Sequence, residues 1–220
     1  MTEGSGTATS TGPSLREQLG AAPDPEFHLR LPAGWVRRTP DDASEAEMER
    51  LLRRRLMPIN RPDLMAASRT LLRDSFRQMR DSRVVAMFLP LNDEELGYLP
   101  VPASMMAVIR QGTPEAPLDE YVEHLIRREG ARPLFDDTRI MRCERETERD
   151  EGGQRIVMSG TSYVTPVPGT KRKRALEIVA SYGRPVDVPR DNELIEAVHT
   201  LFDVTLSTLT WRRPRSVRGE

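Results

Sequence analysis

The sequence predicts an α+β fold in one domain, an antiparallel sheet with helices packed on it. Segments with strand and helix periodicity follow the order β, α, α, β, β, α, β, β, β, α along 220 residues. The stretch 138–183 has the pattern of three strands joined by tight turns, which is typical of an antiparallel meander. Val84–Leu91 is an unbroken apolar run flanked by charge, which indicates a strand covered on both faces. We therefore expect both faces of the sheet to be covered, at least in its middle.

The domain is expected to span residues 26–212. Residues 1–25 are rich in glycine, serine and threonine and hold no apolar segment. Such a segment cannot bury enough surface to offset the entropy of ordering it, so we predict a disordered tail. Residues 213–220 carry arginines and no apolar run, which predicts a solvated basic tail.

In the first half of the chain, alternation of apolar and polar residues predicts a strand at 27–31, followed by a turn and extended structure at Trp35. Ser44 precedes Glu47 by three residues, a capping-box spacing that starts a helix at 45–56. A second helix begins near Pro62. Its apolar and small residues recur with helical spacing and predict one continuous buried stripe: Leu64, Met65, Ser68, Leu71, Leu72, Ser75, Phe76 and Met79.

In the second half, the stretch 98–109 holds an apolar run at Met105–Ile109. Pro100 and Pro102 come before this run and confine the first part of the stretch to an edge or an irregular conformation. The remaining elements have ordinary start and stop signals. They are a helix at 117–129 capped by Gly130, strands at 138–149, 154–165 and 172–183, a helix from Asp191 and a short strand at Leu209–Trp211.

Composition excludes several classes of protein. There are 33 basic and 34 acidic residues, so bulk charge argues against a strongly basic nucleic-acid binder. A single cysteine, Cys143, permits no internal disulfide and fits a reducing compartment. The sequence contains no run of 18 apolar residues, so it predicts no membrane span. No apolar leader segment is visible either. We expect a cytoplasmic protein.

The sequence holds few candidate catalytic residues. The three histidines, His28, His124 and His199, are not spaced as metal ligands, and no phosphate-binding glycine loop or hydrolase motif occurs. Cys143 lies among arginines that could lower its pKa and make it nucleophilic, but a small core residue is the favoured interpretation. We therefore expect no catalytic residues, no metal site and no cofactor, and a protein that is not an enzyme.

Lys171, Arg172, Lys173 and Arg174 form the sharpest local feature. The run could contact an anion or a nucleic acid. A solvated strand end is the favoured interpretation, because the meander places Asp136 and Asp137 at the same end of the sheet, where their charges balance the run. Nucleic acid is the less favoured ligand, since no aromatic residues are interleaved with the basic ones.

Met105 and Met106 are candidates for a partner-binding groove. Methionine side chains are adaptable and suit surfaces that accept varied apolar partners. Core filling is the favoured role for both residues, and the groove is the candidate partner site.

The two ends of the domain resemble a known family. Phe27-His28-Leu29-Arg30-Leu31-Pro32-Ala33-Gly34-Trp35 is similar to the entry motif of PsbP-like proteins, and the segment Leu201–Trp211 is similar to their closing helix and final strand. That superfamily includes the photosystem II extrinsic subunit, the import factor that binds Ran, LpqN-type lipoproteins and accessory chaperones of type VI secretion. The resemblance implies an α-β-α sandwich and a binding or accessory role without a shared catalytic site. This sequence departs from the family by having two helices, not one, before Val84.

The favoured hypothesis is a non-enzymatic cytoplasmic adaptor or chaperone-like module that binds another protein, linked to a secretion or surface system. An alternative is an enzyme built from carboxylates, arginines and Tyr98, Tyr121, Tyr163 or Tyr182. A further alternative is a weak nucleic-acid binder that uses residues 171–174. The sequence leaves the partner and the oligomeric state open.

Overall fold

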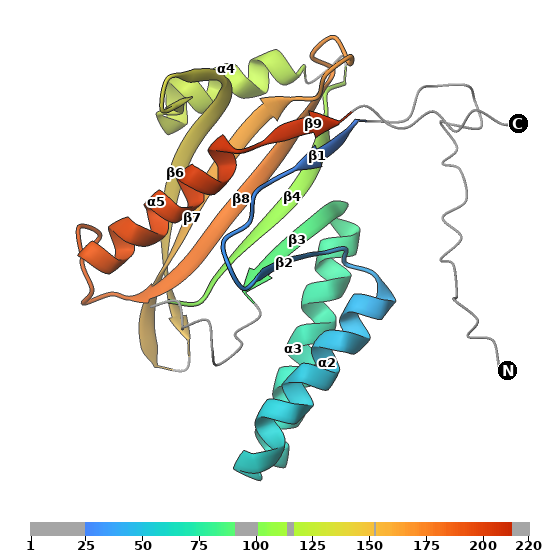
Figure 1. Cartoon of the computed structure of the whole chain (residues 1–220). Helices are drawn as coiled ribbons and strands as arrows, with labels where there is room; N and C mark the ends of the chain where they lie inside the picture. The colour runs from blue at the N-terminus through green and yellow to red at the C-terminus, as the bar shows by residue number, and fades with distance from the viewer. Residues whose placement is uncertain (1–24, 91–100, 114–116, 152, 213–220) are drawn as a thin grey trace, which may run out of the picture.

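A computed structural model of the chain describes residues 25–90, 101–113, 117–151 and 153–212. Seven antiparallel strands form one sheet in the order β2-β3-β4-β8-β7-β6-β5. Helix α5 (Glu193–Ser207) lies along one face, and α4 (Leu118–Glu129) lies on the other (Figure 1). This arrangement confirms the predicted α+β class, with helices packed on an antiparallel sheet.

The strands of the large sheet follow the predicted order with one addition. They are β2 (Trp35–Arg38), β3 (Val84–Pro90), β4 (Ala103–Gln111), β5 (Arg132–Leu134), β6 (Asp137–Glu151), β7 (Gln154–Pro166) and β8 (Arg174–Pro185). The unpredicted strand is β5, which is three residues long and contains a proline, too short to give an alternating pattern.

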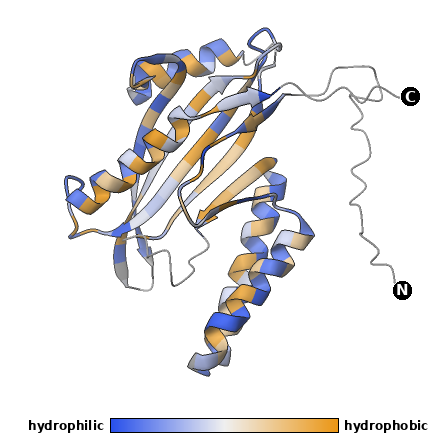
Figure 2. Ribbon diagram, viewed as in Figure 1, coloured by the Kyte–Doolittle hydropathy of each residue, from blue (hydrophilic) through white to orange (hydrophobic). Residues whose placement is uncertain are grey.

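Two hydrophobic cores lie on opposite faces of the sheet because successive strand residues point to opposite sides. On β8, Leu176, Ile178 and Ala180 join the larger core with Phe202 of α5. Ala175 instead joins a smaller core with residues of α4, β6 and β7: Leu118, Leu125, Ala131, Cys143 and Val164. The apolar character of the central strands β3 and β4 is visible in Figure 2.

A separate two-stranded sheet joins the two ends of the described domain. β1 (Glu26–His28) pairs antiparallel with β9 (Thr210–Arg212), and Phe27 faces Trp211 in this pairing. Their rings meet edge to face with centroids 6.2 Å apart. The predicted terminal strand at 209–211 is confirmed, whereas the opening strand predicted at 27–31 is shorter.

Helices α2 (Asp42–Leu56) and α3 (Pro62–Asp81), joined by the short helix η1 (Met57–Ile59), form a hairpin that stands away from the body (Figure 1). The single buried stripe predicted for α3 is wrong. Phe76 is buried, but Leu64 and Leu71 are 41% and 69% exposed. The hairpin meets the sheet at its base, where Phe76 is buried and Arg38 of β2 pairs with Glu47 of α2 at 3.0 Å. The free part of α3 therefore has one helical neighbour rather than a core.

Two local boundaries also differ from expectation. The N-cap of α2 is Asp41, not Ser44, because the Asp41 carboxylate accepts a hydrogen bond of 2.8 Å from the Ser44 backbone N–H. β8 begins at Arg174 rather than at residue 172. Lys171 and Arg172 adopt left-handed backbone angles (φ 51° and 60°), which cannot continue a strand.

The predicted tails lie outside the described residues, apart from Pro25.

Candidate functional site

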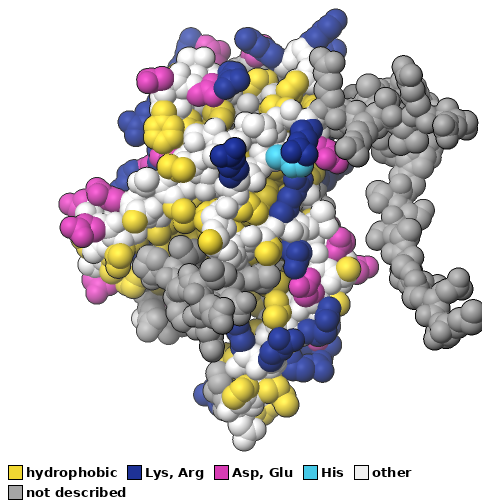
Figure 3. All heavy atoms as spheres, in the orientation of Figure 1, with side chains coloured by type: hydrophobic (Ala, Val, Ile, Leu, Met, Phe, Trp, Pro, Cys, Tyr) yellow, Lys and Arg dark blue, Asp and Glu magenta, His cyan; other side chains and the backbone are white. Residues whose placement is uncertain are grey.

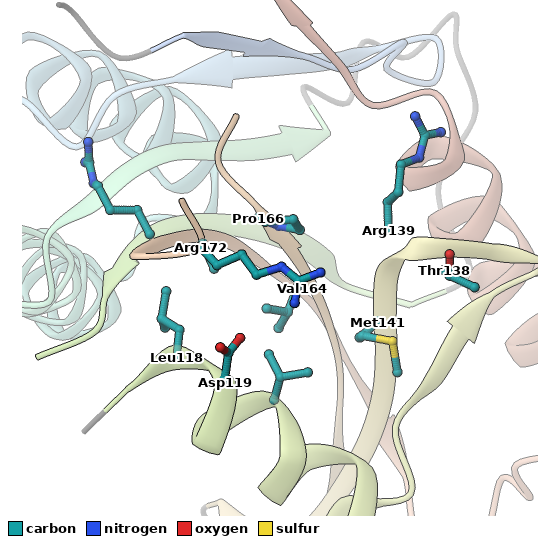
Figure 4. Close-up of a pocket in the computed structure, with 11 residues that line it drawn as sticks. Leu118, Asp119, Thr138, Arg139, Met141, Val164, Pro166 and Arg172 are labelled. Carbon is teal, nitrogen blue, oxygen red and sulfur yellow. The ribbon is translucent and has the colours of Figure 1, made fainter. Parts of the chain in front are cut away.

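The best-formed pocket lies between α4 and the ends of β6, β7 and β8. It has a volume of about 340 Å³. The lining combines apolar side chains with three arginines (Figure 4): Leu118, Asp119, Val122, Thr138, Arg139, Met141, Val164, Pro166, Arg172, Arg174 and Ala175.

The floor of the pocket is a continuation of the smaller core. Leu118 and Val122 stand one helical turn apart on α4, so they present the same side of the helix. Val164 and Ala175 come from β7 and β8, which are neighbours in the sheet. Gly130 ends α4 in the left-handed conformation (φ 67°), where a residue without a Cβ is favoured. The sequence predicted this helix but not the opening beside it.

Arginines occupy the rim of the pocket, and they differ in their partners. Arg139 is bound to Asp137, with Nε donating at 2.9 Å to Oδ1 and a terminal nitrogen donating at 2.7 Å to Oδ2. These bonds lower the pKa of Asp137 to about 2. Arg172 makes no ion pair with any described residue, and its side chain extends over the pocket above Val164 (Figure 4). Arg172 is therefore the cation most available to a ligand.

The loop that holds Arg172 has a strained backbone. Two consecutive residues other than glycine, Lys171 and Arg172, are left-handed, at a cost of roughly 1 kcal/mol each. The loop is closed at its base by hydrogen bonds from the Val167 N–H to the Arg174 carbonyl (2.9 Å) and from the Lys173 N–H to the Thr170 carbonyl (3.0 Å). Strain of this kind on an exposed loop is frequent where a side chain must be held for binding.

Residues of the basic run 171–174 line two pockets, and Arg172 and Arg174 belong to the α4 pocket. Lys171 and Arg172 also line a second pocket of about 340 Å³ on the side of β9, together with Asp137 and Trp211. The sequence placed Asp137 near the run correctly. The expected charge balance is different, because the carboxylate of Asp137 binds Arg139.

The two methionines predicted for a groove point to opposite faces of β4. Met105 is 1% exposed and belongs to the larger core, so its side chain fills the interior rather than a surface. Met106 is half-buried on the other face. Neither lines the α4 pocket.

Two of the tyrosines proposed for an enzyme site, Tyr121 and Tyr163, donate hydrogen bonds to carboxylates. Tyr121 donates to Glu177 at 3.1 Å, and the guanidinium of Arg110 pairs with the same carboxylate. Burial, followed by the charge of Glu177, raises the pKa of Tyr121 to about 12. Tyr163 similarly donates to Asp203 at 2.5 Å. Tyr98 lies outside the described residues.

Tyr182 belongs to a further polar group beneath α5. Its hydroxyl shares a hydrogen bond of 2.8 Å with Nε2 of His199. The other ring nitrogen of His199 lies 3.7 Å from Glu144, whose carboxylate also pairs with Arg142 and Arg190. Sequence reasoning missed this group because its members lie on β6, β8 and α5, which come together only in the fold.

Cys143 is a buried member of the smaller core. Burial raises the pKa of its thiol and outweighs the opposing effect of Arg145. The nucleophilic interpretation of its arginine neighbours therefore fails.

Among the described residues, no group of three or more His, Cys, Asp or Glu side chains could hold a metal ion. No helix in the described ranges is both long enough and apolar enough to cross a membrane.

No family model matches the sequence, and no curated protein matches it. Among solved structures, a protein from Bacteroides thetaiotaomicron is similar at a TM-score of 0.40 and 9% identity, over 86% of this chain and 46% of its own, so the chain spans about half of that protein. LpqN, involved in cell envelope biogenesis of Mycobacterium tuberculosis, is similar at a TM-score of 0.38 and 10% identity, and the match covers 86% of this chain and 84% of LpqN. A mutant of the protein Mog1 is similar at a TM-score of 0.34 and 14% identity, and the match covers 57% of this chain and 78% of Mog1.

TM-scores below 0.5 do not establish a family.

Proposed function

We propose that the chain is a non-enzymatic binding module that captures a short segment of another protein, apolar and acidic in character, in the α4 pocket. The observation that carries this proposal is the position of Arg172, which stands without an ion-pair partner in the described chain above an apolar floor. The role is that of an adaptor or chaperone-like accessory protein.

The two parts of the pocket would bind different parts of the segment. Leu118, Val122 and Val164 offer apolar surface, where burial of a side chain is worth roughly 25 cal/mol for each Å². A guanidinium remains protonated at all working pH values and can hold a carboxylate through two parallel hydrogen bonds. This chemistry serves recognition rather than proton transfer. The volume lies within the range of pockets that take small ligands, so a few residues of extended chain would fill it.

The test compares proteins purified with the chain from its native host. The variants are Val122→Glu, which places a charge in the floor, and Arg172→Ala, which removes the rim cation. The matched control is Arg127→Glu on the exposed side of the same helix. We expect one partner to be lost with both pocket variants and retained with the control.

That partner is then purified and titrated with the wild-type chain and the three variants. We expect Arg172→Ala to weaken binding at least tenfold, and the wild-type affinity to fall as salt is raised. If all variants bind the partner equally, the pocket is not its site. A partner bound only through another surface would leave the adaptor role but remove the assignment to this pocket.

The cytoplasmic location and the link to a secretion or surface system form part of the same proposal. The support for both comes from the sequence and its PsbP-like resemblance. Cell fractionation followed by detection of the chain with an antibody checks the location.

Nucleic-acid binding by residues 171–174 gives a distinguishable result. A labelled single-stranded oligonucleotide would bind with a strong salt dependence, and Val122→Glu would change that binding little. We expect no binding of this kind at physiological salt.

A further inference from the structure

The outer side of α3 presents a neutral, partly apolar face to solvent. Leu64 and Leu71 are exposed and seven residues apart, so they lie two turns from each other on one side of the helix. Ala67 and Ser75, which are also exposed, fall on the same side. In the space-filling view, the free end of the hairpin shows apolar side chains close to basic ones (Figure 3).

The arginines of α3 lie away from this face. At 100° per residue, Arg69, Arg73, Arg77 and Arg80 are all at least about 130° from the line through the two leucines. A helix face that is only solvated normally carries charges. A stripe of leucine and small residues, with the arginines turned aside and Asp74 at its edge about 70° from the line, is the composition of a helix–helix contact.

The hairpin is also polarised along its length. Its free end, residues 49–73, contains seven arginines and two carboxylates. Its base, residues 41–48 and 74–83, contains six carboxylates and three arginines. Arg54, Arg55 and Arg73 make no ion pair with another described residue. The free end is therefore positive, and the base is negative.

We propose that the outer face of α3 binds the same face of a second copy of this chain, in an antiparallel arrangement about a two-fold axis near Leu71. A two-fold interface brings one patch against itself. The antiparallel direction places the positive end of each hairpin beside the negative base of the other. The same two-fold rotation therefore brings the apolar stripes together and pairs the opposite charges. The product is a four-helix bundle made from two α2–α3 hairpins.

Charge placement favours a second copy over a membrane. A helix that lies on an anionic bilayer flanks its apolar side with lysine or arginine, whereas the arginines of α3 point away from Leu64 and Leu71. A nucleic acid would contact the arginines and would leave the neutral face unused.

The length of the helix sets the strength of the contact. Twenty residues give about 30 Å, and at about 10 Å width the two faces bury on the order of 600 Å². Stable complexes bury more than this. We therefore expect a reversible dimer with a dissociation constant in the micromolar range.

Sedimentation velocity over a hundredfold range of concentration tests the proposal. We expect the wild-type chain to change from monomer to dimer, with weaker association at high salt. Leu71→Glu should weaken the dimer at least tenfold, because it brings two carboxylates together at the axis. The matched control is Thr70→Glu, which adds the same charge at an exposed position about 110° from the stripe. Circular dichroism should show that both variants retain the fold.

Cross-linking supplies a second, independent measurement. In a Cys143→Ser background, Leu71→Cys should form a disulfide-linked dimer on mild oxidation, and Thr70→Cys should not. A chain that stays monomeric throughout, or equal behaviour of Leu71→Glu and Thr70→Glu, overturns the proposal. So does a monomer that sediments with phosphatidylglycerol vesicles and loses this property in Leu71→Glu, because the face would then serve a membrane.

Discussion

The hydroxyl of Tyr163 donates a hydrogen bond of 2.5 Å to Oδ1 of Asp203, and Nε of Arg142 donates one of 2.7 Å to the same oxygen. Asp203 lies on α5, whereas Tyr163 and Arg142 lie on the neighbouring strands β7 and β6. This shared acceptor therefore ties α5 to the sheet at a defined position along the helix. Burial raises the pKa of Tyr163, so its hydroxyl remains a donor at every ordinary pH.

Loss of either donor should destabilise the fold, and by different amounts. Tyr163→Phe removes one hydrogen bond to a charged group and should lower the free energy of unfolding by about 1.5–3 kcal/mol. Arg142→Leu leaves Asp203 without its cation and should cost more, about 3 kcal/mol or above. Urea denaturation measures both. Equal stability of Tyr163→Phe and the wild-type chain would mean that water replaces the hydroxyl.

Stability should fall as the solution becomes mildly acidic because of His199. Burial, with the nearby charges of Arg142 and Arg190, lowers the pKa of His199 below 6.5, although Asp203 and Glu146 act in the opposite direction. The unfolded chain takes up a proton near pH 6.5, and the folded chain does so only at lower pH. The folded state therefore loses stability as the pH falls from about 6.5 towards the folded pKa.

Urea midpoints at pH 7.5, 6.5 and 5.5 measure this dependence. His199→Gln should flatten it over that window, and His124→Gln, a substitution of an exposed histidine on α4, should not. A variant of His199 that keeps the full dependence would contradict the assignment.

The ionisation of Asp137 should depend on Arg139. Hydrogen bonds from the Arg139 side chain and backbone hold the pKa of Asp137 at about 2. Arg139→Gln should raise that pKa towards 3.8, and titration of the carboxyl carbon by NMR measures it. Because the pair is exposed, the effect on stability should be small. Arg132→Gln, on the adjacent strand, serves as the control.

Cys143 should react slowly with thiol reagents in the folded protein, because burial keeps the thiol protonated and covered. Thr147→Cys places a thiol at an exposed position on the same strand and the same face. In a Cys143→Ser background it should react with a disulfide reagent at the rate of a free thiol. Fast labelling of Cys143 in native buffer would show that the smaller core opens.

Arg172 should lower the stability of the folded chain through its left-handed backbone and strengthen binding of the partner through its side chain. Arg172→Gly relieves a left-handed residue and should raise the free energy of unfolding by roughly 0.5–1 kcal/mol. The same substitution removes the rim cation and should weaken binding of the partner. Thermal unfolding and titration of the purified partner measure the two effects. A variant that is less stable would show that the side chain itself supports the loop.

The sequence predicted the elements whose pattern is local. The helix at 117–129, with Gly130 as its cap, and the strands predicted at 138–149 and 154–165 depend on residues close to each other in the chain, and both features are confirmed. The start of β8 was placed wrongly because left-handed residues such as Arg172 carry no sequence signal of their own. The α3 stripe was read as one face because periodicity shows which residues align, not which neighbours are present to cover them.

The pocket could be predicted only in part. The run 171–174 was visible, and the meander explained why Asp137 lies near it. The floor residues Val122 and Val164 looked like ordinary core positions, because the depth to which α4 packs on the sheet depends on tertiary contacts. The grouping of His199, Glu144 and Arg142 likewise requires strand register and helix placement that one sequence does not encode locally.

The pairing of β1 with β9 has a consequence for protein engineering. Since Glu26 lies opposite Arg212, a short glycine–serine linker can join these positions, and new ends can be opened in the connection between β6 and β7. A circular permutant of this design should fold. The same adjacency would let the domain be grafted into a surface loop of a host protein as a reporter, with little disturbance of either partner.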